Sequence, residues 1–128
     1  MNYIIDTHTL LWYLSNSIHL PIKSKQILDN KDNVIFISQA SFLEMSIKMS
    51  LDKLKLPVSW SDLLYYCERG GIHILPIETS DSIMLCNLPF HHRDPFDRIM
   101  ICQALNRGYT IISKDSFFDA YGVIRIWE

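Results

Sequence analysis

The sequence predicts an α/β fold built on a parallel sheet, and two observations lead to this expectation. Five short runs are rich in β-branched and other apolar residues without alternating polar ones, which is typical of strands buried on both faces of a sheet. Helical segments separate these runs, and strands that alternate with helices form parallel sheets through right-handed crossovers. The expected strands cover residues 3–6, 34–38, 72–77, 110–113 and 123–127.

The helices expected in the first half of the chain follow from apolar spacing and from residues that stop helices. Residues 41 to about 54 carry an apolar stripe at helical spacing, and Pro57 stops this helix soon afterwards. The helix at residues 59–69 has Ser59 or Ser61 as its N-cap and ends at a glycine pair. The stripe consists of Leu43, Ile47, Leu51 and Leu54. Two shorter helices are expected at residues 7–14 and 21–30.

The second half of the chain contains the helix with the clearest boundaries. Asp94 is a natural N-cap, Pro95 suits the first helical position, and Gly108 follows the last helical residue. This helix is therefore expected at residues 95–107. Shorter helices are expected at residues 79–87 and 116–120.

Composition limits the kind of protein that this chain forms. The 128 residues, 48% of them hydrophobic, suit one domain over residues 1–128 with a single core. The net charge of −2 argues against a strongly basic nucleic-acid binder, although bound cations would make a functional surface less negative. No apolar run is long enough to span a bilayer, and no basic leader precedes the first strand, so we expect a cytoplasmic protein without a membrane partner. The three cysteines form no C-x-x-C pair, which favours reduced thiols over disulfides or a cysteine-rich zinc site.

Four carboxylates lie where expected strands end or expected helices begin. Open α/β sheets bind ligands at the carboxyl ends of their parallel strands. Several acids gathered there would repel one another unless a hard divalent cation shared them, and Mg²⁺ or Mn²⁺ prefers oxygen ligands. The pattern therefore predicts metal-assisted phosphodiester hydrolysis. The four acids are Asp6, Glu44, Asp97 and Asp115.

Two of these acids also have an ordinary structural explanation at the ends of strands. Asp6 and Asp115 each precede an expected helix, and aspartate is a favoured N-cap. Thr7 or Thr9 would cap the first helix equally well, which would free Asp6 for another role.

Glu44 has two structural explanations of its own. It follows Ser41 at the spacing of a capping box, and it precedes Lys48 at the i,i+4 spacing of a favourable ion pair. Near the start of its helix it would also face the crevice at the edge of the sheet.

Asp94 and Asp97 are expected to differ in role. Asp94 directly precedes a proline at the first helical position, so we assign it to capping. Asp97 continues an apolar line with Ile101 and Leu105 at i,i+4 spacing, which turns it inward at the first turn of the helix. An inward acid is costly without a metal or a base, so Asp97 is the acid for which a functional role is most strongly indicated.

Basic residues near the acids are candidates for contacts with substrate phosphate groups. Arg98 has the alternative of pairing with a neighbouring carboxylate. His91 and His92 suggest a zinc pair, but adjacent histidines rarely face the same way, so we do not favour zinc. The phosphate candidates are Lys48, Arg93, Arg98 and Lys114.

Four stretches of the chain resemble the motifs of the PIN domain, in particular those of VapC-type toxins of type II toxin–antitoxin systems. Residues 3–12 (YIIDTHTLLW) resemble the opening of this family, and residues 37–48 resemble its second acidic motif. Residues 92–98 (HRDPFDR) resemble the third motif and form the most specific stretch. Residues 112–115 with Phe117 resemble the fourth.

The resemblance implies an α/β/α sandwich whose five-stranded parallel sheet has the order 3-2-1-4-5. It also implies a Mg²⁺- or Mn²⁺-dependent ribonuclease that acts on RNA, binds a cognate antitoxin whose tail occupies the active-site groove, and forms a homodimer. Carried over by position, the catalytic acids would be Asp6, Glu44, Asp97 and Asp115. The metal ligands among them would be Asp6, Asp97 and Asp115, and Glu44 would orient water or ligate a second metal.

Two alternatives to an active nuclease remain. A receiver-like signalling module also binds Mg²⁺, but its phosphate acceptor would end the third strand, where the sequence is Leu75-Pro76-Ile77. A catalytically silent PIN-like module would serve only to bind a partner. Aromatic residues in the helices at residues 7–14 and 59–69 suggest a protein interface on these elements. They are Trp12, Tyr13, Trp60, Tyr65 and Tyr66.

Overall fold

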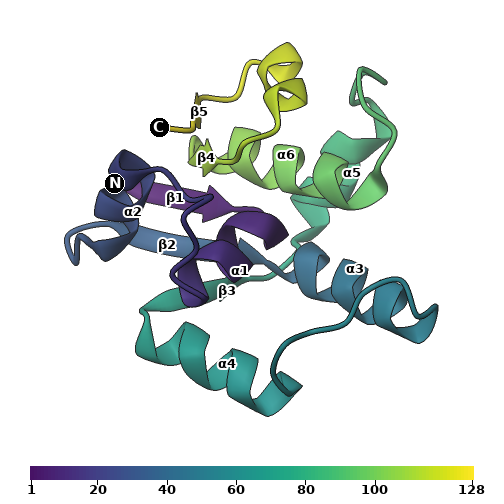
Figure 1. Cartoon of the computed structure of the whole chain (residues 1–128). Coiled ribbons are helices and arrows are strands. Elements are labelled where there is room, and N and C mark those ends of the chain that lie inside the picture. Colours follow the sequence, from purple (N-terminus) through teal and green to yellow (C-terminus); the bar gives the residue numbers. More distant parts are fainter.

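The computed structural model, which describes residues 1–128, contains one parallel sheet with helices on both faces (Figure 1). Its strands follow the order β3-β2-β1-β4-β5, and every neighbouring pair is parallel. The expected fold class and strand order are therefore confirmed. The strands are β1 (Asn2–Ile5), β2 (Val34–Ser38), β3 (Ile72–Leu75), β4 (Thr110–Ile112) and β5 (Arg125–Ile126).

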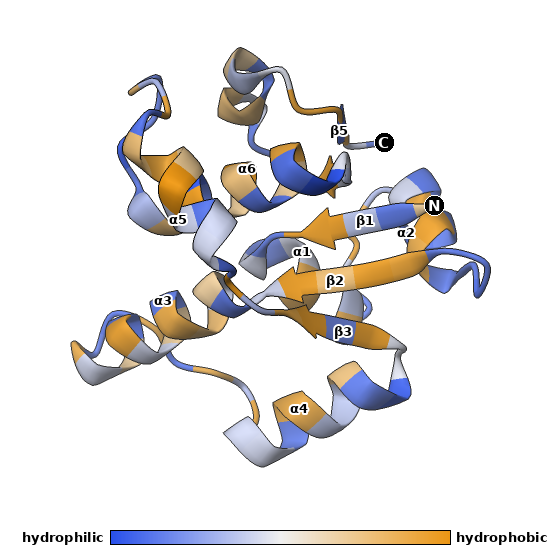
Figure 2. Ribbon diagram, turned by 180° about the vertical axis from the view of Figure 1, so that it is seen from behind, coloured by the Kyte–Doolittle hydropathy of each residue, from blue (hydrophilic) through white to orange (hydrophobic).

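Helices divide between the two faces of this sheet and enclose two hydrophobic clusters. One cluster contains Ile5 from β1 and packs against α1, α2 and α4, whereas the other contains Ile4 and packs against α5 and α6 (Figure 1). Successive strand residues point to opposite faces, so a strand between two helical layers must be apolar on both sides. This is why β2 is mostly hydrophobic along its length and β1 is hydrophobic at its carboxyl end (Figure 2). The helices are α1 (Thr7–Leu14), α2 (Ile22–Asp29), α3 (Gln39–Ser50), α4 (Trp60–Arg69), α5 (Thr79–Cys86), α6 (Pro95–Arg107) and the 3₁₀ helix η1 (Ser116–Tyr121).

Helix α3 begins earlier than expected, directly at the end of β2. Ser38 is its N-cap, and the Ser38 hydroxyl oxygen accepts a hydrogen bond from the Ala40 N–H at 3.0 Å. The expected capping box between Ser41 and Glu44 is therefore wrong, because both residues lie inside the helix. The helix also ends at Ser50, well before Pro57. A single serine ends the strand and starts the helix, which fixes the path of the chain at the edge of the sheet.

The apolar stripe of α3 is largely exposed to solvent. Leu43, Ile47 and Leu51 are 50%, 42% and 57% exposed, whereas Met45 is fully buried. Helix α3 projects beyond the sheet, with hydrophobic residues along its outer part (Figure 2). The helix therefore buries only one narrow face near its start and leaves an apolar surface uncovered.

Helix α6 has the boundaries that the sequence predicts. Asp94 Oδ1 accepts hydrogen bonds from the N–H groups of Phe96 and Asp97 at 2.8 and 3.2 Å, and Pro95 occupies the first turn. Gly108 has φ +69°, a left-handed conformation that glycine adopts without strain and that ends the helix.

Two further features complete the fold. Trp12 is partly buried and packs among the rings of His8, His19 and Trp127, whereas Tyr65 remains half-exposed on α4. No helix has the length and apolar character needed to cross a bilayer.

Candidate active site

A cavity of about 250 Å³ opens where β1 and β2 end, between α1, α3 and the start of α6. Four carboxylates line it, whereas Lys48 is the only lysine or arginine in its lining. The acids come from sequence positions far apart, and the parallel sheet brings them to the same edge. They are Asp6, Glu44, Asp94 and Asp97.

Asp6 is held firmly by three donors at the end of β1. Its Oδ1 accepts hydrogen bonds from the Thr9 N–H at 3.0 Å and from the Thr9 hydroxyl at 2.6 Å. Its Oδ2 accepts a bond of 2.5 Å from the hydroxyl of Ser113, which follows β4. Asp6 is thus the N-cap of α1, and the expectation that Thr7 or Thr9 would replace it as the cap is wrong. The same bonds fix the orientation of a carboxylate that lines the cavity.

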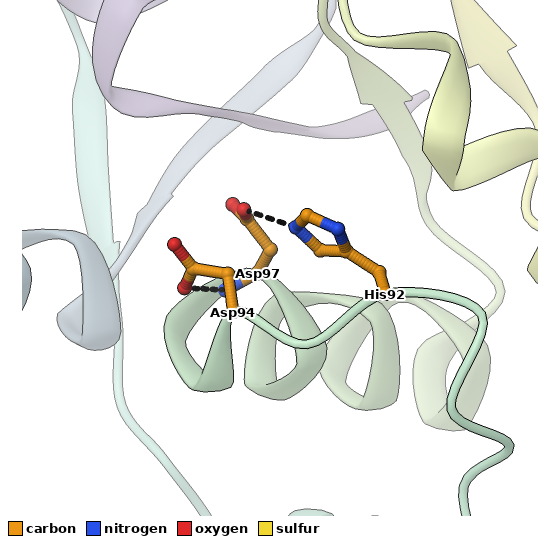
Figure 3. Close-up of side chains that lie close together, drawn as sticks. All are labelled: His92, Asp94 and Asp97. Carbon is orange, nitrogen blue, oxygen red and sulfur yellow. Dashed lines mark hydrogen bonds and ion pairs between the residues drawn. The ribbon is translucent and has the colours of Figure 1, made fainter.

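Asp97 lies in the first turn of α6 and is the most perturbed acid of the site (Figure 3). Burial raises the pKa of Asp97 to about 6, and the neighbouring charges of Asp94 and Glu44 act in the same direction. His92 opposes this rise, because its Nε2 atom lies 3.0 Å from Asp97 Oδ2. The protein therefore provides this buried charge with only partial compensation.

Glu44 forms the expected ion pair on its own helix and also faces the cavity. Its side chain is 13% exposed and lines the cavity, while its Oε2 atom lies 3.3 Å from Lys48 Nζ. The expected i,i+4 ion pair is confirmed, and Lys48, half-exposed, reaches the cavity from the same helix.

The structure does not bring Asp115 into the cavity. Strand β4 ends at Ile112, one residue earlier than expected. The next residue, Ser113, occupies the position beside Asp6. Asp115 is exposed, and its N–H donates to the Ser113 hydroxyl at 3.0 Å. Its side chain makes no capping hydrogen bond either.

Arg98 is engaged within the protein, contrary to the expectation that it contacts substrate phosphate. The residue is 4% exposed, and its guanidinium donates to the carbonyls of Leu88, Pro89 and His92 at 3.0, 2.8 and 3.2 Å. The ring of Phe90 covers the guanidinium at 3.9 Å. Arg98 therefore organises the loop before α6 and is not available to a ligand.

The remaining basic candidates lie on the surface. Lys114 and Arg93 are exposed and do not line the cavity. Lys48 alone among the phosphate candidates lines it.

Sequence analysis missed three residues of this site: Thr9, Ser113 and His92. The two adjacent histidines do diverge, since His91 packs edge-on against Tyr121 and His92 stacks on Phe117. His92 nevertheless reaches Asp97 without its neighbour. The signal available in the sequence was its position in the third motif, close before two acids.

The donor set fits a hard divalent cation. His92, Asp94 and Asp97 each offer one ligand atom, and these atoms lie within 4.8 Å of one another. Carboxylate oxygens suit Mg²⁺ and Mn²⁺. The raised pKa of Asp97 indicates negative charge that the protein leaves undercompensated, which a cation would relieve.

Comparison with known proteins identifies the family. The sequence profile of the PIN domain matches residues 3–124, so the chain belongs to the PIN-domain family. This confirms the resemblance seen in the four motifs. No curated protein sequence matches the chain at a significant level.

Solved structures share the fold at low sequence identity. A chain of VapBC2 from Rickettsia felis, bound to a DNA fragment from their promoter, has a TM-score of 0.72 and 14% identity, with 100% of both chains covered. DNA-bound VapBC from Salmonella typhimurium gives 0.66 and 18%, covering 98% of this chain and 96% of the other. FitAcB from Neisseria gonorrhoeae gives 0.63 and 13%, covering 97% and 96%.

Proposed function

We propose that the chain is a divalent-metal-dependent endoribonuclease and the toxin of a VapC-type toxin–antitoxin pair. One observation carries the proposal: Asp6, Glu44 and Asp97 meet in a cavity that contains a single lysine as its cation. Such a site attracts a cation before it attracts a polyanion, as hydrolysis of phosphodiesters by PIN-domain nucleases requires. Membership of the PIN-domain family supports the same reaction class.

Four acids have roles in this proposal. Asp6 and Asp97 would hold the cation, and Asp94 caps α6 through Oδ1, which leaves its other oxygen for the same purpose. A divalent cation bound there would polarise the scissile phosphate and make the attacking water more acidic. Glu44 Oε2 pairs with Lys48, and Oε1 would orient the water and accept its proton.

Asp115 has no direct role in the proposed site. It was a candidate ligand by position in the fourth motif, but Ser113 occupies the place next to Asp6. Ser113 would act by orienting Asp6, as residues bonded to metal ligands do.

An antitoxin is the protein partner that we propose. The structures that share the fold include VapBC complexes. An open groove of about 540 Å³ on α3 and α4 is lined mainly by apolar side chains, including Phe42, Leu43, Trp60 and Leu64. Exposed apolar surface of this kind is typical of protein interfaces. A homodimer through α1 and α4 stays a proposal, with Tyr65 and Tyr66 as the exposed aromatic residues.

The test is cleavage of a panel of RNAs, including tRNA and a single-stranded DNA control, by purified chain freed of any partner. Reactions contain EDTA, Mg²⁺ or Mn²⁺. We expect metal-dependent RNA cleavage that Asp97→Asn abolishes and that Asp115→Asn, an exposed acid outside the cavity, retains. Full activity of Asp97→Asn would refute the site, and folded protein inactive with every metal would favour the silent binding module.

A further inference from the structure

His92 is the one side chain that forms a hydrogen bond with the carboxylate of Asp97, the most perturbed acid of the site. Figure 3 shows its imidazole approaching Asp97 from the side away from Asp94, with Nε2 3.0 Å from Asp97 Oδ2. We propose that His92 is a positioning residue that holds Asp97 Oδ2 so that Oδ1 faces the cation. This inference rests on the metal-dependent function proposed above.

The imidazole ring is fixed on one side by an aromatic partner. The rings of His92 and Phe117 are stacked, with centroids 3.8 Å apart and planes 16° from parallel. Phe117 in turn packs on Phe118, which is fully buried in the core. The ring therefore cannot swing freely, and its Nε2 atom is aimed at the carboxylate of Asp97.

The backbone of His92 is fixed as well, by two side chains from other elements. Its N–H donates to the Tyr121 hydroxyl at 2.8 Å, and its carbonyl accepts from Arg98 at 3.2 Å. The same two side chains hold the preceding loop, because both donate to the Pro89 carbonyl at 2.8 Å. The buried guanidinium of Arg98 therefore has a structural role: it holds in place the histidine that faces Asp97.

The chemistry of the contact defines the role. An ionised carboxylate only accepts hydrogen bonds, so with Asp97 charged the bond requires a hydrogen on His92 Nε2. This bond takes up Oδ2 and leaves Oδ1 without a protein donor. Carboxylates that bind metals are commonly held by such bonds, and losing one typically lowers metal affinity about 10- to 100-fold.

His91 provides a matched control within the same loop. It is exposed, and its ring contacts Tyr121 edge-on at 5.1 Å without reaching any acid of the site. Two adjacent residues of the same type therefore differ in one respect that matters, the hydrogen bond to Asp97.

The test is calorimetric titration of the intact chain with Mg²⁺ and with Mn²⁺, accompanied by thermal unfolding without metal. His92→Phe keeps an aromatic ring on Phe117 and removes the donor, so metal affinity should fall about tenfold or more. His92→Gln restores an N–H donor and should recover part of the loss. His91→Phe should bind metal like the parent chain.

A second variant tests the same role without changing His92. Tyr121→Phe deletes the hydroxyl that anchors the His92 backbone and leaves every acid in place, so metal affinity should fall in the same direction. This measurement decides the matter if His92→Phe does not fold.

The outcomes separate this inference from the proposed function. Unchanged affinity in both His92→Phe and Tyr121→Phe would overturn the role of His92 and leave the metal site intact. Absence of any metal binding by the parent chain would overturn the proposed function itself. Pulsed electron paramagnetic resonance of bound Mn²⁺ adds a third outcome. A directly coordinated imidazole nitrogen that disappears in His92→Phe would make His92 a ligand and refute the positioning role.

Discussion

A carboxylate lies at each end of helix α6, fully buried at one end and a quarter exposed at the other, and the protein treats the two in opposite ways. At the C-terminal end, Asp81 from α5 is 1% exposed and accepts bonds from both terminal nitrogens of Arg107 at 2.8 and 3.1 Å. At the N-terminal end, Asp97 has no arginine or lysine partner and shares its cavity with other acids.

The difference appears in the pKa values of the two acids. Burial by itself would raise the pKa of Asp81, but hydrogen bonds from Arg107, Asn106 and the Glu78 N–H lower it below its usual range. Burial raises the pKa of Asp97 to about 6, the hydrogen bond from His92 opposes this rise, and the charges of Asp94 and Glu44 add to it. An arginine of the protein neutralises the acid at one end of α6, where Arg107 pairs with Asp81, but not at the other end, where Asp97 lies. The other end, which we call the uncompensated end because no arginine or lysine pairs with Asp97, is the one that we assign to a cation.

The largest effect should follow from breaking the compensated end. Asp81→Asn removes the ion pair and leaves the mostly buried Arg107 without its charged partner, so we expect the free energy of unfolding to fall by about 3 kcal/mol. Urea unfolding at neutral pH without metal measures it. Asp119→Asn, which breaks the exposed pair with Arg125, is the control and should cost less. An equal loss of unfolding free energy in both variants would mean that the buried Asp81–Arg107 pair stabilises the fold no more than the exposed pair does.

The second effect is a loss of stability with rising pH, which only the uncompensated end should produce, because the lowered pKa of Asp81 instead gives a loss of stability at low pH. Because the folded chain holds the Asp97 proton up to a pKa of about 6, above the usual 3.8, its contribution to stability is present below about pH 4. It is lost as the pH rises through about 6, by at most roughly 3 kcal/mol. Asp97→Asn should remove this loss and be more stable than the parent chain at neutral pH. Identical pH profiles for parent and variant would contradict the raised pKa.

The third effect is the converse, stabilisation by added cation. A ligand that binds only the folded state at about ten times its dissociation constant adds about 1.4 kcal/mol to the free energy of unfolding. We expect this gain with Mg²⁺ or Mn²⁺ in the parent chain and in Asp81→Asn, and its loss in Asp97→Asn. Thermal unfolding with and without metal measures it. A gain that survives in Asp97→Asn would show that the cation binds elsewhere.

The sequence predicted those parts of this comparison that depend on local signals or on strand order. The limits of α6 follow from Asp94, Pro95 and Gly108, which act on their own turns of backbone. The meeting of Asp6 with Asp97 follows from parallel strands that end at one edge. Both could be derived without coordinates because the physical cause is confined to a few neighbouring residues or to the topology.

Other parts depend on contacts that sequence spacing does not contain. The partner of Asp81 lies 26 residues away on another helix, and Arg98 binds loop carbonyls whose positions only the tertiary structure sets. Asp115 was a candidate because it follows the expected fourth strand and matches the fourth motif, but its side chain is exposed and lies outside the cavity. Ser113 was overlooked because the expected fourth strand included it, whereas the hydroxyl that bonds Asp6 lies just after β4.

The smallest effect concerns Lys48, the only lysine or arginine that lines the cavity at the uncompensated end. The side chain is half-exposed, and such ion pairs contribute little, so Lys48→Gln should change the free energy of unfolding by no more than about 0.5 kcal/mol. The substitution should change the binding of ligands more than it changes stability, and in opposite directions for metal and for RNA. Metal should bind slightly more tightly, because a competing positive charge leaves Glu44, whereas the KM for RNA should rise if Lys48 contacts phosphate. Calorimetry and steady-state kinetics at two salt concentrations measure both. If Lys48→Gln instead destabilises the chain as much as Asp81→Asn does, the cavity is neutralised by the protein after all, and the contrast between the two ends of α6 fails.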